Sequence, residues 1–203
     1  MNLLFVGPQG SGKGTQAKIV AKKIGVPDIS MGDLLRNASL ELQEKINKYI
    51  NKGHLAPPKI VVQALKQRIG KDDCNEGYIL DGFPRSEEQV ELAKGVLELD
   101  KVFLIDISDE EAIKRISSRL NCKKCGAVFN SITNLPKITG ECDFCNGELH
   151  IRSDDKPEAI KQRLEIYHKD TEPILKIYED KLVRVDGSQD IDIVTDDILR
   201  ELE

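Results

Sequence analysis

Short unbroken runs of apolar residues recur along the chain, separated by longer stretches in which apolar residues return every three or four positions. An unbroken run of this kind is typical of a strand that is buried on both faces of a parallel sheet. The runs that predict such strands lie at residues 3–6, 77–81 and 102–105, and a shorter strand is expected within 26–30. Residues 182–186, in which Arg184 interrupts the apolar residues, are expected to form the last strand.

The periodic stretches between these strands predict helices. They cover residues 15–24, 30–36, 40–52, 58–69, 86–99, 108–119, 157–178 and 191–202. Gly53 is expected to end one of them, and Pro173 to kink or break the long one. Strands that alternate with helices predict the α/β class, a parallel sheet with helices on both sides. The helices within residues 30–69 follow one another without a strand, so they form an excursion from that sheet.

The composition fits a globular protein. The chain has 203 residues, 39% hydrophobic and 32% charged, which is enough for one well-cored domain with an insertion. No apolar stretch approaches the ~20 residues of a membrane helix, and the first run is too short for a signal sequence. With a net charge of −5 the chain does not attract nucleic acid as a whole. We therefore expect a cytoplasmic protein that binds anions through local cations.

A glycine-rich segment, Gly7-Pro8-Gln9-Gly10-Ser11-Gly12-Lys13-Gly14-Thr15, joins the first predicted strand to the first predicted helix. A phosphate-binding loop needs this order, because backbone N–H groups and the helix N-terminus then face one anion. In such a loop Lys13 reaches the β- and γ-phosphates of a nucleotide, and the Thr15 hydroxyl helps to hold Mg²⁺. The Walker spacing is met, although Gly14 stands at the usual Ser/Thr position.

A second chemical signal closes the strand predicted at residues 77–81. Asp81 ends the apolar run, and Gly82-Phe83-Pro84-Arg85 follows at once. A carboxylate at the end of a buried strand resembles the Walker B arrangement, in which it organises Mg²⁺ and its water. The alternative is a solvent-exposed strand end with no ligand.

Four of the five cysteines form CxxC pairs, Cys122 with Cys125 and Cys142 with Cys145, while Cys74 stands alone. In a cytoplasmic chain such pairs predict a zinc site rather than disulfides. Zinc ribbons also occur in nucleic-acid-binding modules, but this segment lacks a basic stripe. A structural clamp for a segment too small to have its own core is the favoured interpretation.

Taken in order, these motifs make the chain resemble an adenylate kinase of the long-lid bacterial and archaeal type. The resemblance rests on the glycine-rich loop, on Asp81-Gly82-Phe83-Pro84-Arg85, on Arg115 with Arg119, on the lid cysteines and on Arg152-Ser153-Asp154-Asp155. It implies an α/β fold: a P-loop parallel β-sheet core flanked by helices, with a small helical acceptor-binding excursion and an inserted zinc-ribbon lid. The implied core is 1–29, 54–119 and 154–203, the AMP-binding region 30–53 (extending to about 59 at most), and the lid 120–153.

The resemblance also implies a reaction, the reversible transfer of the ATP γ-phosphoryl group to AMP, giving two ADP. Mg²⁺ would accompany ATP, structural Zn²⁺ would occupy the lid, and the protein would act as a monomer without nucleic-acid or membrane partners. Phosphoryl transfer depends on alignment and charge neutralisation, for which arginine offers planar, permanently charged forks.

Individual residues acquire roles from the same resemblance. Those implied in catalysis are Lys13, Asp81, Arg85, Arg119, Arg152 and Arg163. Those implied at ATP are Gly10, Ser11, Gly12, Lys13, Gly14, Thr15, Arg115, Arg119 and Gln189. Those implied at AMP are Met31, Arg36, Gly82, Arg85, Gln89, Arg152 and Arg163.

Two positions bear on which acceptor is used. Gln89 can read the adenine edge, but Ser86-Glu87-Glu88-Gln89 is also a capping box, in which Gln89 serves its own helix. Met31 stands where the family usually has threonine, and a thioether cannot donate a hydrogen bond. The alternatives are a kinase for another small acceptor such as CMP, UMP or shikimate, and a nucleotide-dependent binding module that docks a partner through the ribbon.

Overall fold

A parallel sheet forms the centre of the protein, which is described by a computed structural model over residues 1–50, 54–132, 134–152 and 155–203. Its strands are β1 (Asn2–Val6), β2 (Asp28–Ser30), β3 (Tyr78–Asp81), β4 (Lys101–Asp106) and β8 (Leu182–Asp186). They lie in the order β2-β3-β1-β4-β8, and every neighbouring pair is parallel. The strands predicted from apolar runs are thereby confirmed, with β1 in the middle.

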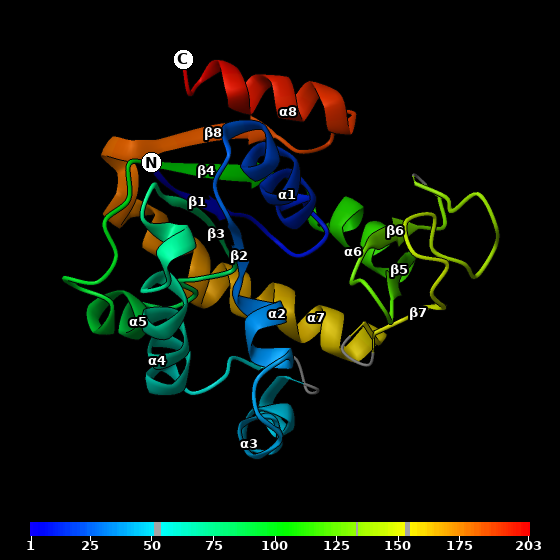
Figure 1. Ribbon diagram of the computed structural model, residues 1–203, viewed down its shortest axis with the longest axis horizontal. Coiled ribbons are helices and arrows are strands. Elements are labelled where there is room, and N and C mark those ends of the chain that lie inside the picture. The colour runs from blue at the N-terminus through cyan, green and yellow to red at the C-terminus, as the bar shows by residue number, and fades with distance from the viewer. Residues whose placement is uncertain (51–53, 133, 153–154) are drawn as a thin grey trace.

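Helices cover both faces of this sheet (Figure 1). They are α1 (Lys13–Ile24), α2 (Met31–Arg36), α3 (Leu40–Ile50), α4 (Pro58–Ile69), α5 (Glu87–Leu92), α6 (Asp109–Ser117), α7 (Pro157–Ile166) and α8 (Ile191–Arg200), with short turns η1 (Asp72–Cys74), η2 (Tyr167–Thr171) and η3 (Glu172–Lys181). Leu3 and Phe5 pack with α1 and α8, whereas Leu4 and Val6 pack with α2 and α4. Both faces of β1 are therefore buried, which explains its continuous apolar sequence.

A small antiparallel sheet lies beside α6, away from the central sheet (Figure 1). Its strands are β5 (Arg119–Cys122), β6 (Val128–Asn130) and β7 (Leu149–His150), in the order β6-β5-β7. We call the described part of residues 119–150 the lid segment. Its buried apolar cluster consists of Cys122, Phe129, Cys142 and Leu149, so little apolar surface stabilises it.

The helix predicted over residues 86–99 is much shorter in the structure. Helix α5 ends at Leu92, and turns follow it. Gly95 adopts a φ of +71°, a backbone conformation that glycine accepts readily and that is incompatible with a continuing helix. The prediction that the helix reaches Leu99 was wrong.

The sequence pattern predicted that Arg115 and Arg119 share one helix, and this prediction was wrong. Helix α6 ends at Ser117, and the hydroxyl of Ser118 donates a hydrogen bond of 2.7 Å to the carbonyl oxygen of Lys114. This bond occupies a carbonyl near the helix end, and the chain then extends so that Arg119 pairs with Asn130 across β5 and β6. Arg119 therefore belongs to the lid sheet.

The long predicted helix breaks before Pro173, as expected. Helix α7 gives way to the π-helical turn η2 and then to η3, which has Pro173 in its first turn. The predicted helix end at Gly53 and the lid boundary at 153/154 lie outside the described residues. Within the described ranges, no helix has the length and apolar content needed to cross a bilayer.

Candidate active site

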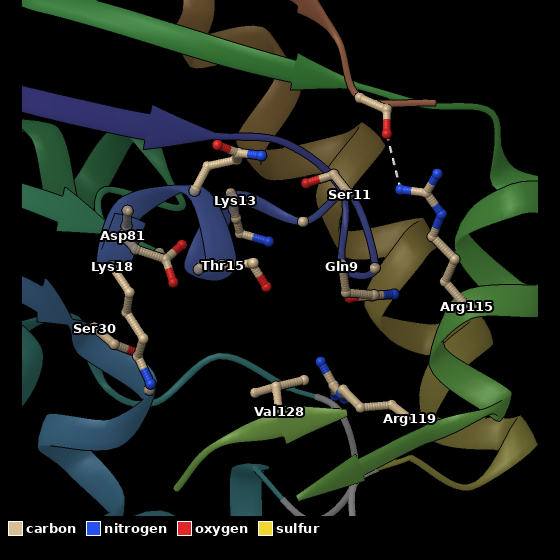
Figure 2. A pocket seen from close by; sticks show the side chains of 18 of the residues that line it. Gln9, Ser11, Lys13, Thr15, Lys18, Ser30, Asp81, Arg115, Arg119 and Val128 are labelled. Carbon is tan, nitrogen blue, oxygen red and sulfur yellow. Dashed lines mark hydrogen bonds between the residues drawn. The ribbon is translucent and has the colours of Figure 1, made fainter. Parts of the chain in front are cut away.

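The glycine-rich loop follows β1 and leads into α1 at the carboxyl edge of the sheet (Figure 2). Gly10 has a φ of +83°, and a Cβ built on it would lie 2.8 Å from the carbonyl oxygen of Ala112 on α6. Only glycine fits this close approach. The loop is therefore held against α6, and the N-terminus of α1 faces the cavity described below.

The half-buried amine of Lys13 lies in this loop and donates a hydrogen bond of 3.1 Å to the carbonyl oxygen of Pro8. Desolvation lowers the pKa of Lys13 to about 8; the negative charge of Asp81 opposes this shift, whereas nearby arginines add to it. These arginines are Arg85, Arg163 and Arg119. Several permanent cations thus crowd the Lys13 amine, and an anionic ligand would relieve that crowding.

Two buried oxygens beside Lys13 have no hydrogen-bond partner among the described residues: Asp81 Oδ1 and Ser11 Oγ. The other carboxylate oxygen, Asp81 Oδ2, would lie 3.1 Å from a Cβ placed on Gly14. Buried oxygens without partners are costly unless a ligand satisfies them. Carboxylate and hydroxyl oxygens suit Mg²⁺ and its water molecules, so these residues fit a magnesium–nucleotide complex.

Arg119 and Arg163 are brought together by Asp155, a residue of the Arg152–Asp155 motif to which no role in the site was assigned. Asp155 Oδ2 accepts a hydrogen bond of 2.9 Å from Arg119 Nε, and Oδ1 accepts bonds from Arg119 Nη2 and, at 3.3 Å, from Arg163 Nη1. The Asp155 side chain is completely buried. It therefore ties β5 of the lid segment to α7 of the core.

Arg36 lies on α2, where Asp33 accepts a hydrogen bond of 2.8 Å from its Nη2. Arg152 approaches the same carboxylate at 3.9 Å. Burial alone would raise the pKa of Asp33, but the hydrogen bond and charge of Arg36, with the charge of Arg152, hold that pKa below its usual value. Asp33 therefore stays ionised and holds these two arginines near each other.

Only half of the capping box proposed for Gln89 is present. Ser86 Oγ accepts the Gln89 backbone N–H at 3.4 Å. The Gln89 side-chain oxygen accepts the backbone N–H of Arg85 at 2.7 Å, one residue earlier than a capping box requires. Because Gln89 also lines the cavity, the structure leaves a contact with a base open.

Arg115 and Gln189 each bond to the backbone of the segment that joins β8 to α8. Arg115 donates hydrogen bonds to Glu111 Oε1 at 2.7 Å and to the carbonyl oxygen of Gly187 at 2.8 Å. Gln189 donates to the carbonyl oxygen of Asp186 at 3.2 Å. In Figure 2, Arg115 and Arg119 lie to one side of the glycine-rich loop.

A single cavity of about 600 Å³ brings these elements together. Every residue that the resemblance placed at ATP or AMP lines it. Met31 lines it too, although its side chain is only 2% exposed and packs in the core. Further residues line the cavity without having been predicted, among them Lys18, His54, Leu55, Ala56, Val128, Asn130 and Asn134. No sequence motif includes these residues, because they have in common only that the fold places them beside the cavity.

The four lid cysteines form a separate cluster. Their sulfur atoms all lie within 4.8 Å of one another, with Cys122 to Cys145 at 3.4 Å and Cys125 to Cys142 at 3.5 Å. Four thiolates around Zn²⁺ at ~2.3 Å have sulfur–sulfur distances of about 3.8 Å. The backbone N–H groups of Lys124 and Cys125 point to Cys122 Sγ at 3.4 and 3.5 Å. The donor set and its size therefore fit zinc.

Comparison with known proteins gives one consistent result. A family model described as adenylate kinase matches residues 5–183. The adenylate kinase of Archaeoglobus fulgidus is 44% identical over an alignment that covers 100% of this chain and 98% of the relative. The adenylate kinase of Caldicellulosiruptor saccharolyticus is 42% identical, with 100% and 99% covered. That of Kosmotoga olearia is 44% identical, with 100% and 99% covered.

Proposed function

The chain belongs to the adenylate kinase family, and we propose that it transfers the γ-phosphoryl group of ATP reversibly to AMP, giving two ADP. It is a phosphotransferase. The observation that carries the proposal is one cavity lined both by a phosphate-binding loop with Lys13 and by the separate arginines Arg36 and Arg85. A cavity that aligns two phosphate compounds needs little covalent chemistry of its own.

On the donor side, we propose that the glycine-rich loop and Lys13 hold the β- and γ-phosphates of ATP. Arg115, which donates to the carbonyl oxygen of Gly187, and Gln189 both line the cavity and would flank the adenine base of ATP. Arg119 and Arg163 would surround the group in transfer. Negative charge arriving among these cations would raise the pKa of Lys13 again, so that ATP binding stabilises the charged amine.

On the acceptor side, Arg36, Arg85 and Arg152 would bind the phosphate of AMP. The hydrogen bond from Arg36 to Asp33 would hold the guanidinium in place before AMP arrives. The phosphate of AMP would then compete with the Asp33 carboxylate for that guanidinium. Gln89 uses one lone pair of its side-chain oxygen to hold Arg85, so the other lone pair and the NH₂ group would remain to pair with the base.

Two metal ions complete the proposal. Mg²⁺ bound with ATP would be held near Asp81, Ser11 and Thr15, where it supplies positive charge to the phosphates. Zn²⁺ in the lid would be held by Cys122, Cys125, Cys142 and Cys145 and would play no chemical part. A monomeric state, a cytoplasmic location and the domain boundaries stay predictions of the sequence.

The choice of acceptor tests the proposal. Met31 costs one neutral hydrogen bond relative to threonine, roughly tenfold in discrimination at most. A contact from Gln89 to adenine is worth ~1–3 kcal/mol of discrimination. We therefore expect the highest kcat/KM for AMP, weaker rejection of CMP, UMP and GMP than a threonine enzyme shows, and a sharper preference in Met31→Thr.

The experiment measures ADP formation from ATP with each of the four monophosphates. Gln89→Ala should blunt the preference for AMP. A higher kcat/KM for CMP or UMP in the unaltered protein would contradict the assignment of AMP and leave only the kinase class.

A further inference from the structure

A π-helical turn lies directly behind the candidate active site. In η2 the backbone N–H of Glu172 donates to the carbonyl oxygen of Tyr167, five residues earlier, instead of four as in an α-helix. Such turns insert one extra residue into a helix and are frequent at functional sites. Here the turn separates α7, which carries Arg163, from η3, so it decides where Thr171 lies.

Thr171 reaches the main chain of a proposed acceptor-binding residue. Its Oγ1 donates a hydrogen bond of 2.9 Å to the carbonyl oxygen of Arg85, 86 residues away in sequence. The N–H of Arg85 is held from the other side by Gln89 Oε1 at 2.7 Å. Thr171 is 5% exposed and Gln89 2%. Two buried side chains therefore fix both backbone polar groups of Arg85.

This arrangement matters because Arg85 lies in irregular backbone. The chain between β3 and α5 has neither helical nor sheet hydrogen bonds to hold it. The Arg85 guanidinium is also folded back, with Nε donating to the carbonyl oxygen of Gly82 at 2.7 Å. The direction of the guanidinium thus depends on where its own peptide groups are held.

A second, small cavity of about 50 Å³ is lined both by Thr171 and by residues of the candidate active site. Its walls include Thr171 and Tyr167 of η2 together with cationic residues of the candidate active site. Those cations are Lys13, Arg85 and Arg163. Thr171 therefore belongs to the wall immediately behind the groups that would surround the phosphates.

We propose that Thr171 is a positioning residue for the acceptor phosphate, which it controls through the backbone of Arg85. This inference rests on the proposed function, since it assumes that Arg85 binds the phosphate of the acceptor. Without the Oγ1 hydrogen bond, the Arg85 peptide can shift and its guanidinium no longer points at the phosphate. A misplacement of about 1 Å far from the reacting atoms can cost a hundredfold in rate.

The test compares Thr171→Val, which keeps the shape and removes the hydroxyl, with Thr171→Ser, which keeps the hydroxyl. Thr171→Val should raise the KM for AMP roughly three- to tenfold and lower kcat, because one hydrogen bond is lost. The KM for ATP should stay within about twofold of that of the unaltered protein. Thr171→Ser should restore the KM for AMP.

Thr195→Val provides a matched control. Thr195 is 2% exposed and lies on α8, and its single hydroxyl hydrogen can be donated to Gln16 Oε1 at 2.7 Å or to the carbonyl oxygen of Ile191 at 2.9 Å. The Thr195→Val variant should lower the melting temperature at least as much as Thr171→Val, without a selective rise in the KM for AMP. Should Thr171→Val not fold, Thr171→Ala replaces it in the same comparison.

The outcomes separate this inference from the proposed function. If the Thr171 variant changes the KM values for ATP and AMP alike, or matches Thr195→Val, or if serine does not rescue it, Thr171 has only a structural role and the inference is wrong. Failure of the proposed function is visible in the unaltered protein alone, as absent ADP formation from ATP and AMP, and would overturn both.

Discussion

The central sheet and the lid segment differ in how much apolar side-chain surface they bury. Strand β1 contributes Leu3, Leu4 and Phe5, all completely buried. The lid segment buries a cluster of four side chains, two of them cysteines, and leaves other large apolar residues more than half exposed. Those exposed residues are Ile132, Leu135, Ile138 and Phe144.

The stability of the central sheet is therefore shared among many buried side chains, whereas that of the lid segment is expected to rest on few. Loss of one core side chain leaves many others in place, whereas the lid segment, if it binds zinc as proposed, would depend on one cluster of four sulfur atoms. The two regions meet at Asp155, which contacts Arg119 of the lid and Arg163 of the core. The following predictions test the comparison, beginning with the largest expected effect.

Removal of the proposed lid zinc should have the largest effect, because it should destabilise the lid segment and leave the central sheet folded. Apparent zinc binding to small four-ligand sites contributes about 10–16 kcal/mol. In Cys125→Ser we expect zinc to be lost and amide hydrogen exchange to become fast in β5–β7 while β1 stays protected. Cys74→Ser, which lies outside the cluster, is the matched control and should keep its zinc. Protein purified without chelators that contains neither zinc nor iron would contradict the site.

Lys13→Ala should separate activity from stability within the core. We expect kcat to fall at least about a hundredfold, because a charge that stabilises the transferring group is gone. Thermal stability at pH 7 should not fall, because the variant removes a desolvated cation crowded by arginines. Coupled ADP assays and calorimetry measure the two effects, and near-normal turnover would refute the role of Lys13.

The same cause predicts a pH dependence of the ligand-free protein. The pKa of Lys13 is about 8 in the folded state against 10.5 in the unfolded chain. Between these values the unfolded chain holds a proton that the folded chain has released, so stability should rise with pH in this window. Lys13→Ala should remove this contribution from urea unfolding measured at pH 7.5 to 10.5.

Asp155→Asn tests the junction between the two regions. The substitution keeps the shape but removes the charge that faces Arg119 and Arg163, so we expect a loss of about 2–3 kcal/mol in unfolding free energy. The kcat should fall as well, since both guanidiniums lose their orientation. Asp143→Asn, a substitution in the lid outside this contact, serves as control. Urea unfolding that is equal in both variants would show that the junction carries no stability.

The smallest effect is expected at an exposed contact on the core side. His168 of η2 lies 2.8 Å from Glu172 Oε2 and 2.9 Å from Asp109 Oδ1 on α6. Its hydrogen bonds to Glu172 and Asp109 raise the pKa of His168 above 6.5. The contact therefore stabilises the fold fully below pH 6.5, and this contribution is lost as the pH rises through the raised pKa.

Because His168 is half exposed, we expect less than ~1 kcal/mol. Urea midpoints of the unaltered protein and of His168→Gln should differ at pH 5.5 and converge at pH 8.5. A difference of equal size at both pH values would mean that packing, not charge, is responsible.

The sequence predicted the features that depend on local pattern. Strands β1, β3 and β4 carry continuous apolar runs because both faces of the sheet are covered there, and their prediction follows directly. Strand β8 lies at the edge of the sheet, and its apolar residues are interrupted by the exposed Arg184. The glycine-rich loop was predictable because several backbone requirements coincide in one short segment. The lid strands were not predicted, since they are short and mostly lack an apolar face.

Long-range partners explain the remaining errors and omissions. Arg119 was assigned to a helix because its spacing from Arg115 fits one, but pairing with Asn130 decides its conformation. Asp155 and Thr171 were overlooked as site residues because their importance depends on residues more than thirty positions away. No local pattern contains that information.

The position of β1 in the middle of the sheet has a consequence for how the protein is made. This strand emerges from the ribosome well before its partners β3 and β4, which begin at Tyr78 and Lys101. At about 5–20 residues per second, roughly 5–20 s pass before β4 is synthesised. The lid cysteines, by contrast, are synthesised within a few seconds of one another. Strand β1 therefore waits as an unpaired apolar segment until both of its neighbours in the sheet have been synthesised.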